Sequence, residues 1–216
     1  PACIAFMSDG PYHENIAVLD SRLGPGAATQ LIVTFDTDYL LLEGNAADGV
    51  AMAQSNGSYF LHPKDDSNHV TVRNNTFRGS VATTAIAPTN QITLTSVTDQ
   101  EVCWNRLIHD GDQNVDAAIE MNGSSSTPDA MNTYVYRNTV VSERRAFRFS
   151  GGTSASEFEA NAFFGRSAGV FGSNFTDGAV ANQELAETDF DAEGRLSGAA
   201  RSTHGGIAGA EILVMP

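Results

Sequence analysis

The sequence has very little lysine, no long hydrophobic run and few basic residues of any kind. Lys64 is the only lysine among 12 basic residues, and 26 acidic residues give the chain a formal net charge of −14. This balance excludes a general nucleic-acid-binding protein, which needs a broad positive surface. No run of about 18 apolar residues is present, so we expect no membrane span.

Cysteine is also scarce, because Cys3 and Cys103 are the only two. They are too few for a disulfide framework and lack the Cys-x-x-Cys spacing of zinc and redox sites. Their spacing leaves open whether they pair with each other. The chain begins at Pro1, with neither an initiator methionine nor a signal peptide, so we expect a processed product or part of a longer chain.

Helical periodicity is nearly absent, and 182–194 (NQELAETDFDAEG) is the best helical candidate. What is present instead is a repeated pattern. It occurs as VTVRNNTF (70–77), EVCWNRLI (101–108), TYVYRNTV (133–140) and EFEANAFF (157–164), and more loosely as LLLEGNAA (40–47). Each copy has an apolar residue three positions before a shared asparagine and another two positions after it. The shared asparagines are Asn45, Asn75, Asn105, Asn138 and Asn161.

A second pattern follows each copy of the first. It occurs at 49–57, 83–90, 117–123, 146–152 and 168–174, each a short alternating strand that ends in Asn, Gly or Ser. Such units cannot bury their apolar face alone, so we expect an all-β solenoid in which stacked units share a core. The repeated asparagine, at a bend, is expected to form a hydrogen-bonded ladder. The alternative is an antiparallel sandwich of short strands.

These units resemble the coils of right-handed parallel β-helix proteins of the pectate-lyase-like superfamily. The end of the chain, DAEGRLSGAARSTHGGIAGAEI (191–212), is similar to the terminal coil of many secreted members, although IAGAEI carries an extra alanine. The resemblance covers about residues 15–212. It implies one β-helix domain over 1–216, with an N-terminal coil or edge in 1–30, central coils in 31–180, and a terminal coil and cap in 181–216. It also implies an extracellular or cell-surface location.

Strand alternation predicts two outward rows of side chains in the first pattern. One row is Thr71, Glu101, Tyr134 and Glu157, and the other is Arg73, Cys103, Tyr136 and Glu159. Aromatic faces beside polar groups suit sugar rings, so Tyr134 and Tyr136 are candidate ligand contacts. The alternative is that tyrosine simply forms strands well on a half-wet surface.

Basic residues are concentrated at 137–148, where Arg137, Arg144, Arg145 and Arg148 occur. In the second pattern, Arg148 and Glu120 of the preceding unit are expected to be outward neighbours. Lyases of acidic polysaccharides need a cation for the uronate, a base and an acid. We therefore select Arg148, Arg145, Tyr136 and Glu120 as candidate catalytic residues, and Tyr134, Arg137 and Arg144 as candidate ligand-binding residues. The alternative for Glu120 and Arg148 is a surface ion pair.

No familiar catalytic motif of polysaccharide-processing β-helices is present. The D-P-H-D motif of mannuronan epimerases is missing, as are the paired aspartates of polygalacturonases, and THGG (203–206) lies in the terminal turn. Whether the chain is an enzyme is therefore open; if it is one, we expect a polysaccharide lyase or a glycoside hydrolase.

One loop has the composition of a calcium site. In DGDQNVD (110–116), oxygen-bearing side chains alternate at Asp110, Asp112, Asn114 and Asp116, and calcium prefers six to eight oxygen ligands. The EF-hand pattern is not satisfied, because Val115 and Met121 occupy positions that need glycine and glutamate. The alternative is an ordinary polar turn.

Two functions follow from these patterns. The first is an extracellular module that binds or processes a polysaccharide on one outward sheet. The second is a non-catalytic structural or adhesive role, as an adhesin, filament or spike subunit that self-associates through the ends of its coils.

Overall fold

The computed structural model describes residues 2–6, 13–23, 30–35, 37–51, 59–64, 67–80, 84–86, 99–109, 117–122, 133–150, 157–171, 182–204 and 209. Within these residues the regular elements are β-strands, apart from the 3₁₀-helix η1 (Glu187–Asp189) and the helix α1 (Gly198–His204). The prediction of an all-β chain is confirmed. In this described part, neither helix has the length and apolar character that crossing a membrane requires.

The strands form three sheets, which we name A, B and C. Sheet A contains β1 (Ala2–Phe6), β4 (Gln30–Phe35), β7 (Tyr59–Lys64), β10 (Thr84–Ile86), β13 (Ala117–Asn122), β16 (Arg145–Ser150) and β19 (Ala168–Phe171). Sheet B contains β2 (His13–Leu19), β5 (Thr37–Glu43), β8 (Asn68–Arg73), β11 (Gln100–Cys103), β14 (Thr133–Tyr136) and β17 (Glu157–Glu159). Sheet C contains β3 (Arg22–Leu23), β6 (Ala46–Ala51), β9 (Thr76–Ser80), β12 (Arg106–His109), β15 (Thr139–Ser142), β18 (Ala162–Gly165) and β20 (Gln183–Glu184).

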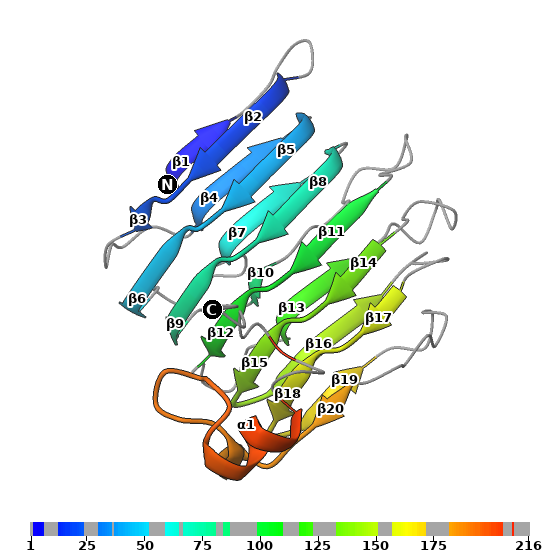
Figure 1. The fold of residues 1–216 in the computed structure, drawn as a ribbon. Coiled ribbons are helices and arrows are strands. Elements are labelled where there is room, and N and C mark those ends of the chain that lie inside the picture. Colours follow the sequence, from blue (N-terminus) through cyan, green and yellow to red (C-terminus); the bar gives the residue numbers. More distant parts are fainter. Residues whose placement is uncertain are drawn as a thin grey trace, which may run out of the picture.

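From β1 to β19, consecutive strands enter sheets A, B and C in turn, and the cycle repeats (Figure 1). The next described strand, β20, lies in sheet C. Parallel neighbours need a long crossover connection, and here the strands of the other two sheets provide it. Every strand pairing within the three sheets is parallel, so the alternative of an antiparallel sandwich is wrong. Each sheet is open and has two end strands, β1 and β19 in A, β2 and β17 in B, and β3 and β20 in C.

The apolar positions of the repeat line the space between the sheets. In sheet B the inward row is Leu42, Val72, Val102, Val135 and Phe158, and in sheet C it is Ala47, Phe77, Leu107, Val140 and Phe163. Aromatic rings from all three sheets meet in this core. The centroid of Phe147 in β16 lies 4.9 Å from that of Phe158 and 5.3 Å from that of Phe163, both edge-on. Burying each Val, Leu or Phe side chain contributes about 2 kcal/mol.

The predicted asparagine ladder is confirmed, and it is one residue longer than the sequence indicated. Each side-chain amide donates to the Oδ1 atom of the next asparagine, at 3.1, 3.0, 3.0, 3.0 and 3.0 Å along Asn45, Asn75, Asn105, Asn138, Asn161 and Asn182. The amide of Asn105 also donates to the main-chain oxygen of Val72 at 2.9 Å. The ladder thus satisfies buried polar groups at the bend between sheets B and C.

The residue before each of the first five ladder asparagines adopts a left-handed backbone conformation. The φ angles are 70° at Gly44, 55° at Asn74, 57° at Trp104, 52° at Arg137 and 52° at Ala160. Only one of these residues is glycine, although the left-handed backbone conformation costs other residues roughly 1–2 kcal/mol. The ladder hydrogen bonds hold the chain in this bend, which redirects it from sheet B to sheet C within two residues.

The segment after the last sheet A strand corrects one expectation. Residues 182–194 do not form an α-helix; they contain β20 and η1, and the helix α1 begins later, at Gly198. Aspartate side chains accept local backbone N–H groups, from Ala186 to Asp189 at 3.0 Å and from Glu193 to Asp191 at 2.9 Å. Such bonds compete with helix formation.

This C-terminal segment, 182–204, is anchored to sheet C by apolar contacts. Leu196 and Ala200 are buried with Ala162 of β18, and Leu185 and Phe190 pack against them. The segment therefore covers part of the outer face of sheet C, as Figure 1 also shows for α1 beside β18.

Candidate functional site

The outer face of sheet B carries the two rows that strand alternation predicted. The register aligns Thr71, Glu101, Tyr134 and Glu157 in one row, and Arg73, Cys103, Tyr136 and Glu159 in the other. Both predicted rows are confirmed. Side chains from four successive turns of the chain are therefore brought together although they are far apart in the sequence.

A hollow of about 290 Å³ lies on this face. The strands behind it, β8, β11 and β14, are neighbours in sheet B (Figure 1). The hollow is lined by Arg73, Asn74, Glu101, Cys103, Trp104 and Tyr136. Two of these, Asn74 and Trp104, occupy the left-handed positions before ladder asparagines. The same bend that links sheets B and C therefore places an indole ring beside the outward row.

Glu101 is the one carboxylate among the residues lining this hollow, and two hydroxyl groups orient it. The hydroxyl of Tyr136 donates a short hydrogen bond to Oε1, and the hydroxyl of Thr71 donates to Oε2 at 3.5 Å. Burial, followed by the hydrogen bond to Glu101, raises the pKa of Tyr136 above its ordinary value of 10.0. Tyr136 therefore stays protonated and acts as a donor, while Glu101 remains the group that can accept a proton or a sugar hydroxyl.

Cys103 lies in the outward row but is buried by its neighbours, with 1% of its surface exposed. Burial raises the pKa of its thiol to about 12, so the thiol is protonated at neutral pH and is not a nucleophile. Cys103 is also a free cysteine, so the structure contains no bridge between Cys103 and Cys3.

The two arginines of this face both have partners. Arg73 Nη2 lies 2.9 Å from Glu43 Oε2, and this hydrogen bond is the main reason that the pKa of Glu43 is lowered. The guanidinium of Arg137 lies 5.1 Å from the ring centroid of Trp104, a cation–π contact. The positive charges at the rim are thus largely neutralised or stacked, and exposed Glu157 and Glu159 make the end of this face acidic.

A second cluster on sheet B was not predicted from the sequence. The rings of Tyr39 and His69 are stacked with centroids 4.4 Å apart, and Nδ1 of His69 lies 2.7 Å from Asp38 Oδ1. Nε2 of His69 lies 3.6 Å from Asp99 Oδ2. Three of these residues have left-handed φ angles, 57° at Tyr39, 50° at His69 and 59° at Asp99. No glycine or turn motif at these positions indicates a left-handed conformation. Neither the asparagine pattern nor the alternating-strand pattern could therefore predict the cluster.

The sequence-predicted site residues are divided between sheets. Tyr134, Tyr136 and Arg137 lie on sheet B or at its end, and the outward tyrosine Tyr134 is 37% exposed. Glu120 and Arg148 lie in register on β13 and β16 of sheet A, where Arg148 Nη1 is 3.2 Å from Glu120 Oε1. The predicted neighbour relation between Glu120 and Arg148 is confirmed.

The Glu120–Arg148 pair on sheet A is less exposed than the expectation of two outward side chains implied. The ion pair of the alternative is present, but its carboxylate is buried, because Glu120 has 5% of its surface exposed while Arg148 is half-buried. Arg145 begins β16 and Arg144 precedes it in the bend after β15, both half-buried. Tyr136 is therefore in a different sheet from Glu120, Arg145 and Arg148, and the catalytic and ligand-binding roles of all seven residues stay predictions.

The predicted calcium ligands Asp110, Asp112, Asn114 and Asp116 lie outside the described residues. Among the residues that are described, no group of three or more His, Cys, Asp or Glu side chains is placed to hold a metal ion. Calcium binding by 110–116 stays a prediction from composition.

Comparison of the chain with protein-family models, with curated proteins and with solved structures found no match. What the chain does is therefore inferred from its own residues.

Proposed function

We propose that the chain is a right-handed parallel β-helix of the pectate-lyase-like kind, and that it acts outside the cell on a polysaccharide. Three features support this fold assignment: the repeated A–B–C order of the strands, their parallel pairing, and the asparagine ladder at one bend. On this proposal the polysaccharide lies on the outer face of sheet B.

The observation that carries the functional proposal is the composition of the sheet B hollow. It combines Trp104 and Tyr136, whose rings suit the apolar face of a sugar, with the oriented carboxylate of Glu101, which suits a hydroxyl. Tyr134, which is 37% exposed and lies on the same strand as Tyr136, extends the aromatic surface beyond the hollow.

If the site also cleaves its ligand, Glu101 is the group that would accept a proton, because both Tyr136 and Cys103 are held in protonated form. The reaction would then be a polysaccharide lyase or glycoside hydrolase reaction.

The experiment is a glycan-array measurement with the full chain, followed by calorimetry on the glycans that bind. Glu101→Gln keeps the size of the side chain and removes its charge, so we expect it to weaken binding about tenfold. Arg166→Gln is the matched control, because Arg166 lies after β18 and pairs with Glu143 and Glu187 at the surface. An absorbance scan for unsaturated uronate products tests cleavage. Absence of binding to every acidic and neutral glycan would overturn the proposal.

A second candidate function is a structural or adhesive subunit, and the end strands favour it. Among the described strands, β1, β2 and β3 each pair on one side only, and Leu19 of β2 is 50% exposed. Unpaired strand edges can pair with another chain. Light scattering and electron microscopy would distinguish the two functions, since a stable monomer at high concentration contradicts a filament subunit.

A further inference from the structure

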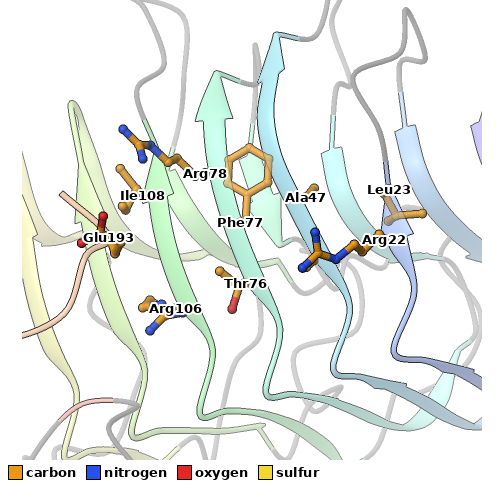
Figure 2. Close-up of a pocket in the computed structure, with 10 residues that line it drawn as sticks. Arg22, Leu23, Ala47, Thr76, Phe77, Arg78, Arg106, Ile108 and Glu193 are labelled. Atoms are coloured by element: carbon orange, nitrogen blue, oxygen red, sulfur yellow. The ribbon is translucent and has the colours of Figure 1, made fainter.

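A larger hollow than the one on sheet B lies on sheet C. Its volume is about 550 Å³, and it is lined by Arg22, Leu23, Ala46, Ala47, Thr76, Phe77, Arg78, Arg106, Ile108 and Glu193 (Figure 2). We call it the arginine groove. Three of the twelve basic residues of this acidic chain line it, together with one carboxylate.

The spacing of the arginines follows from the sheet register. Arg22, Ala46, Thr76 and Arg106 form one outward row across β3, β6, β9 and β12. The backbones of these two arginines are thus three strand spacings apart, roughly 14 Å across the sheet. Ala46 and Thr76 between them are small, and this leaves space above the sheet; Figure 2 shows Thr76 between Arg22 and Arg106.

The C-terminal segment forms one wall of the groove. Gly194 has a φ angle of 68°, and a Cβ atom at this position would lie 2.7 Å from Cγ1 of Ile108. Glycine therefore allows the segment to approach β12 closely, which places Glu193 at the groove. Arg78, in register with Ile108, is exposed on the next row.

We propose that the arginine groove binds a sugar chain that carries widely spaced oxyanions, either carboxylate or sulfate groups. Guanidinium groups bind both oxyanions through paired N–H donors. The three arginines lie on β3, β9 and β12, across roughly 14 Å of the sheet, so an extended chain can contact all of them at once. Glu193 restricts the groove to ligands whose charges are separated.

A densely charged chain does not fit this surface. Nucleic acid carries a phosphate about every 3.4 Å along each strand, and the net charge of −14 repels it outside the groove. A chain with widely spaced oxyanions can place them beside the arginines and keep its uncharged parts over the rest of the acidic surface. The choice of a sugar chain rests on the proposed function, but the groove is a separate site on another sheet.

The test uses three forms of one polymer: unmodified dextran, carboxymethyl dextran and dextran sulfate, each of low substitution, with a single-stranded DNA dodecamer as the dense polyanion. Binding to the full chain is measured by calorimetry at low and at physiological salt. We expect carboxymethyl dextran or dextran sulfate to bind, with salt-sensitive affinity, and unmodified dextran not to bind at this groove. The form that binds more tightly identifies the oxyanion.

The variants assign that binding to the groove. Arg22→Gln should lower the affinity about fivefold, Arg22→Gln with Arg78→Gln further, and Glu193→Gln should raise it about twofold. Arg166→Gln, which removes an exposed arginine outside the groove, should change nothing. Arg22 and Arg78 are exposed, so these variants should fold, and circular dichroism checks this.

Three results would overturn the proposal. They are equal binding of charged and unmodified dextran, unchanged affinity in the double arginine variant, and tighter arginine-dependent binding of DNA. Glu101→Gln should leave dextran-derivative binding intact, so failure of the sheet B proposal and failure of this one are distinguishable.

Discussion

The hydroxyl of Tyr136 donates a hydrogen bond to the carboxylate of Glu101 across the neighbouring strands β14 and β11. The two residues belong to the two different outward rows of sheet B, so this bond connects the rows at the hollow. It also makes the positions of both side chains depend on the stacking of successive turns of the chain.

Tyr136→Phe removes this bond and keeps the ring. We expect a loss of glycan affinity of about tenfold, because Glu101 loses its strongest orienting donor, and a fall of about 1 kcal/mol in the free energy of unfolding. Calorimetry and urea unfolding measure the two effects. Tyr134→Phe is the control, since it removes a hydroxyl from the exposed tyrosine of the same strand and should change affinity less than twofold. Equal losses in both variants would contradict a special role for the Tyr136–Glu101 bond.

The asparagine ladder should make a large contribution to stability at its centre. The side chain of Asn105 is fully buried; it donates to Asn138 at 3.0 Å and accepts from the backbone and the side chain of Asn75, both at 3.0 Å. Asn105→Ala leaves several buried groups without partners, so we expect a loss of about 3 kcal/mol or more.

Asn182→Ala, at the half-buried end of the ladder, should cost about 1 kcal/mol. Urea unfolding of the two variants tests the difference. If both cost the same, the central hydrogen bonds are not what stabilises the bend.

Much of the fold and part of the site could be predicted from the sequence, because repetition makes one pattern visible several times. An asparagine equivalent to Asn105 occurs in every copy of the repeat, with apolar residues at fixed distances on either side. This frame predicted the positions of the ladder, the inward rows and the outward rows. Once the register was aligned, Glu120 and Arg148 had to be neighbours, and so did Cys103 and Tyr136.

Other features had no repeated signal. The repeated asparagine indicated a bend, but nothing in the frame indicated that the strands on either side of it belong to different sheets, joined at left-handed residues such as Trp104 and Arg137. Tyr136 and Arg148 are 12 positions apart in the sequence, so they look like one cluster, but the bend at Asn138 and a second bend after β15 send them to different sheets. Asn182 was missed because Glu184, two positions after it, is not apolar and so does not match the frame.

Ala160 is a buried alanine whose replacement by glycine should stabilise the fold. Its φ angle is 52°, a conformation that costs alanine roughly 1 kcal/mol and glycine almost nothing. We expect Ala160→Gly to raise the free energy of unfolding by about 0.5 to 1 kcal/mol. Ala162→Gly is the matched control, two residues later in the extended strand β18, and should lower it by about 1 kcal/mol. If Ala160→Gly lowers the free energy of unfolding, the packing of the alanine methyl group contributes more than the backbone strain at this φ angle costs.

Alkaline conditions should destabilise the fold through Cys103. Burial raises the pKa of this thiol from 9.0 to about 12, so from about pH 9 upward the unfolded chain releases a proton that the folded chain keeps. The free energy of unfolding therefore falls as pH rises through this window, by at most about 1.4 kcal/mol per pH unit from this group. Between pH 9 and 10 the thiol should dominate over Tyr136, whose ordinary pKa of 10.0 places its own effect higher.

Urea unfolding at intervals from pH 8 to 10 measures this slope in the wild type, in Cys103→Ala and in Cys3→Ala. Cys103→Ala should flatten the slope, and comparison of Cys3→Ala with the wild type measures the contribution of the other thiol. Alkylation followed by mass spectrometry gives an independent reading, because the Cys103 peptide should be modified only after unfolding. Rapid labelling of Cys103 in the folded chain at pH 8 would show that the thiol is accessible and that the outward rows do not pack over it, since a buried protonated thiol reacts slowly.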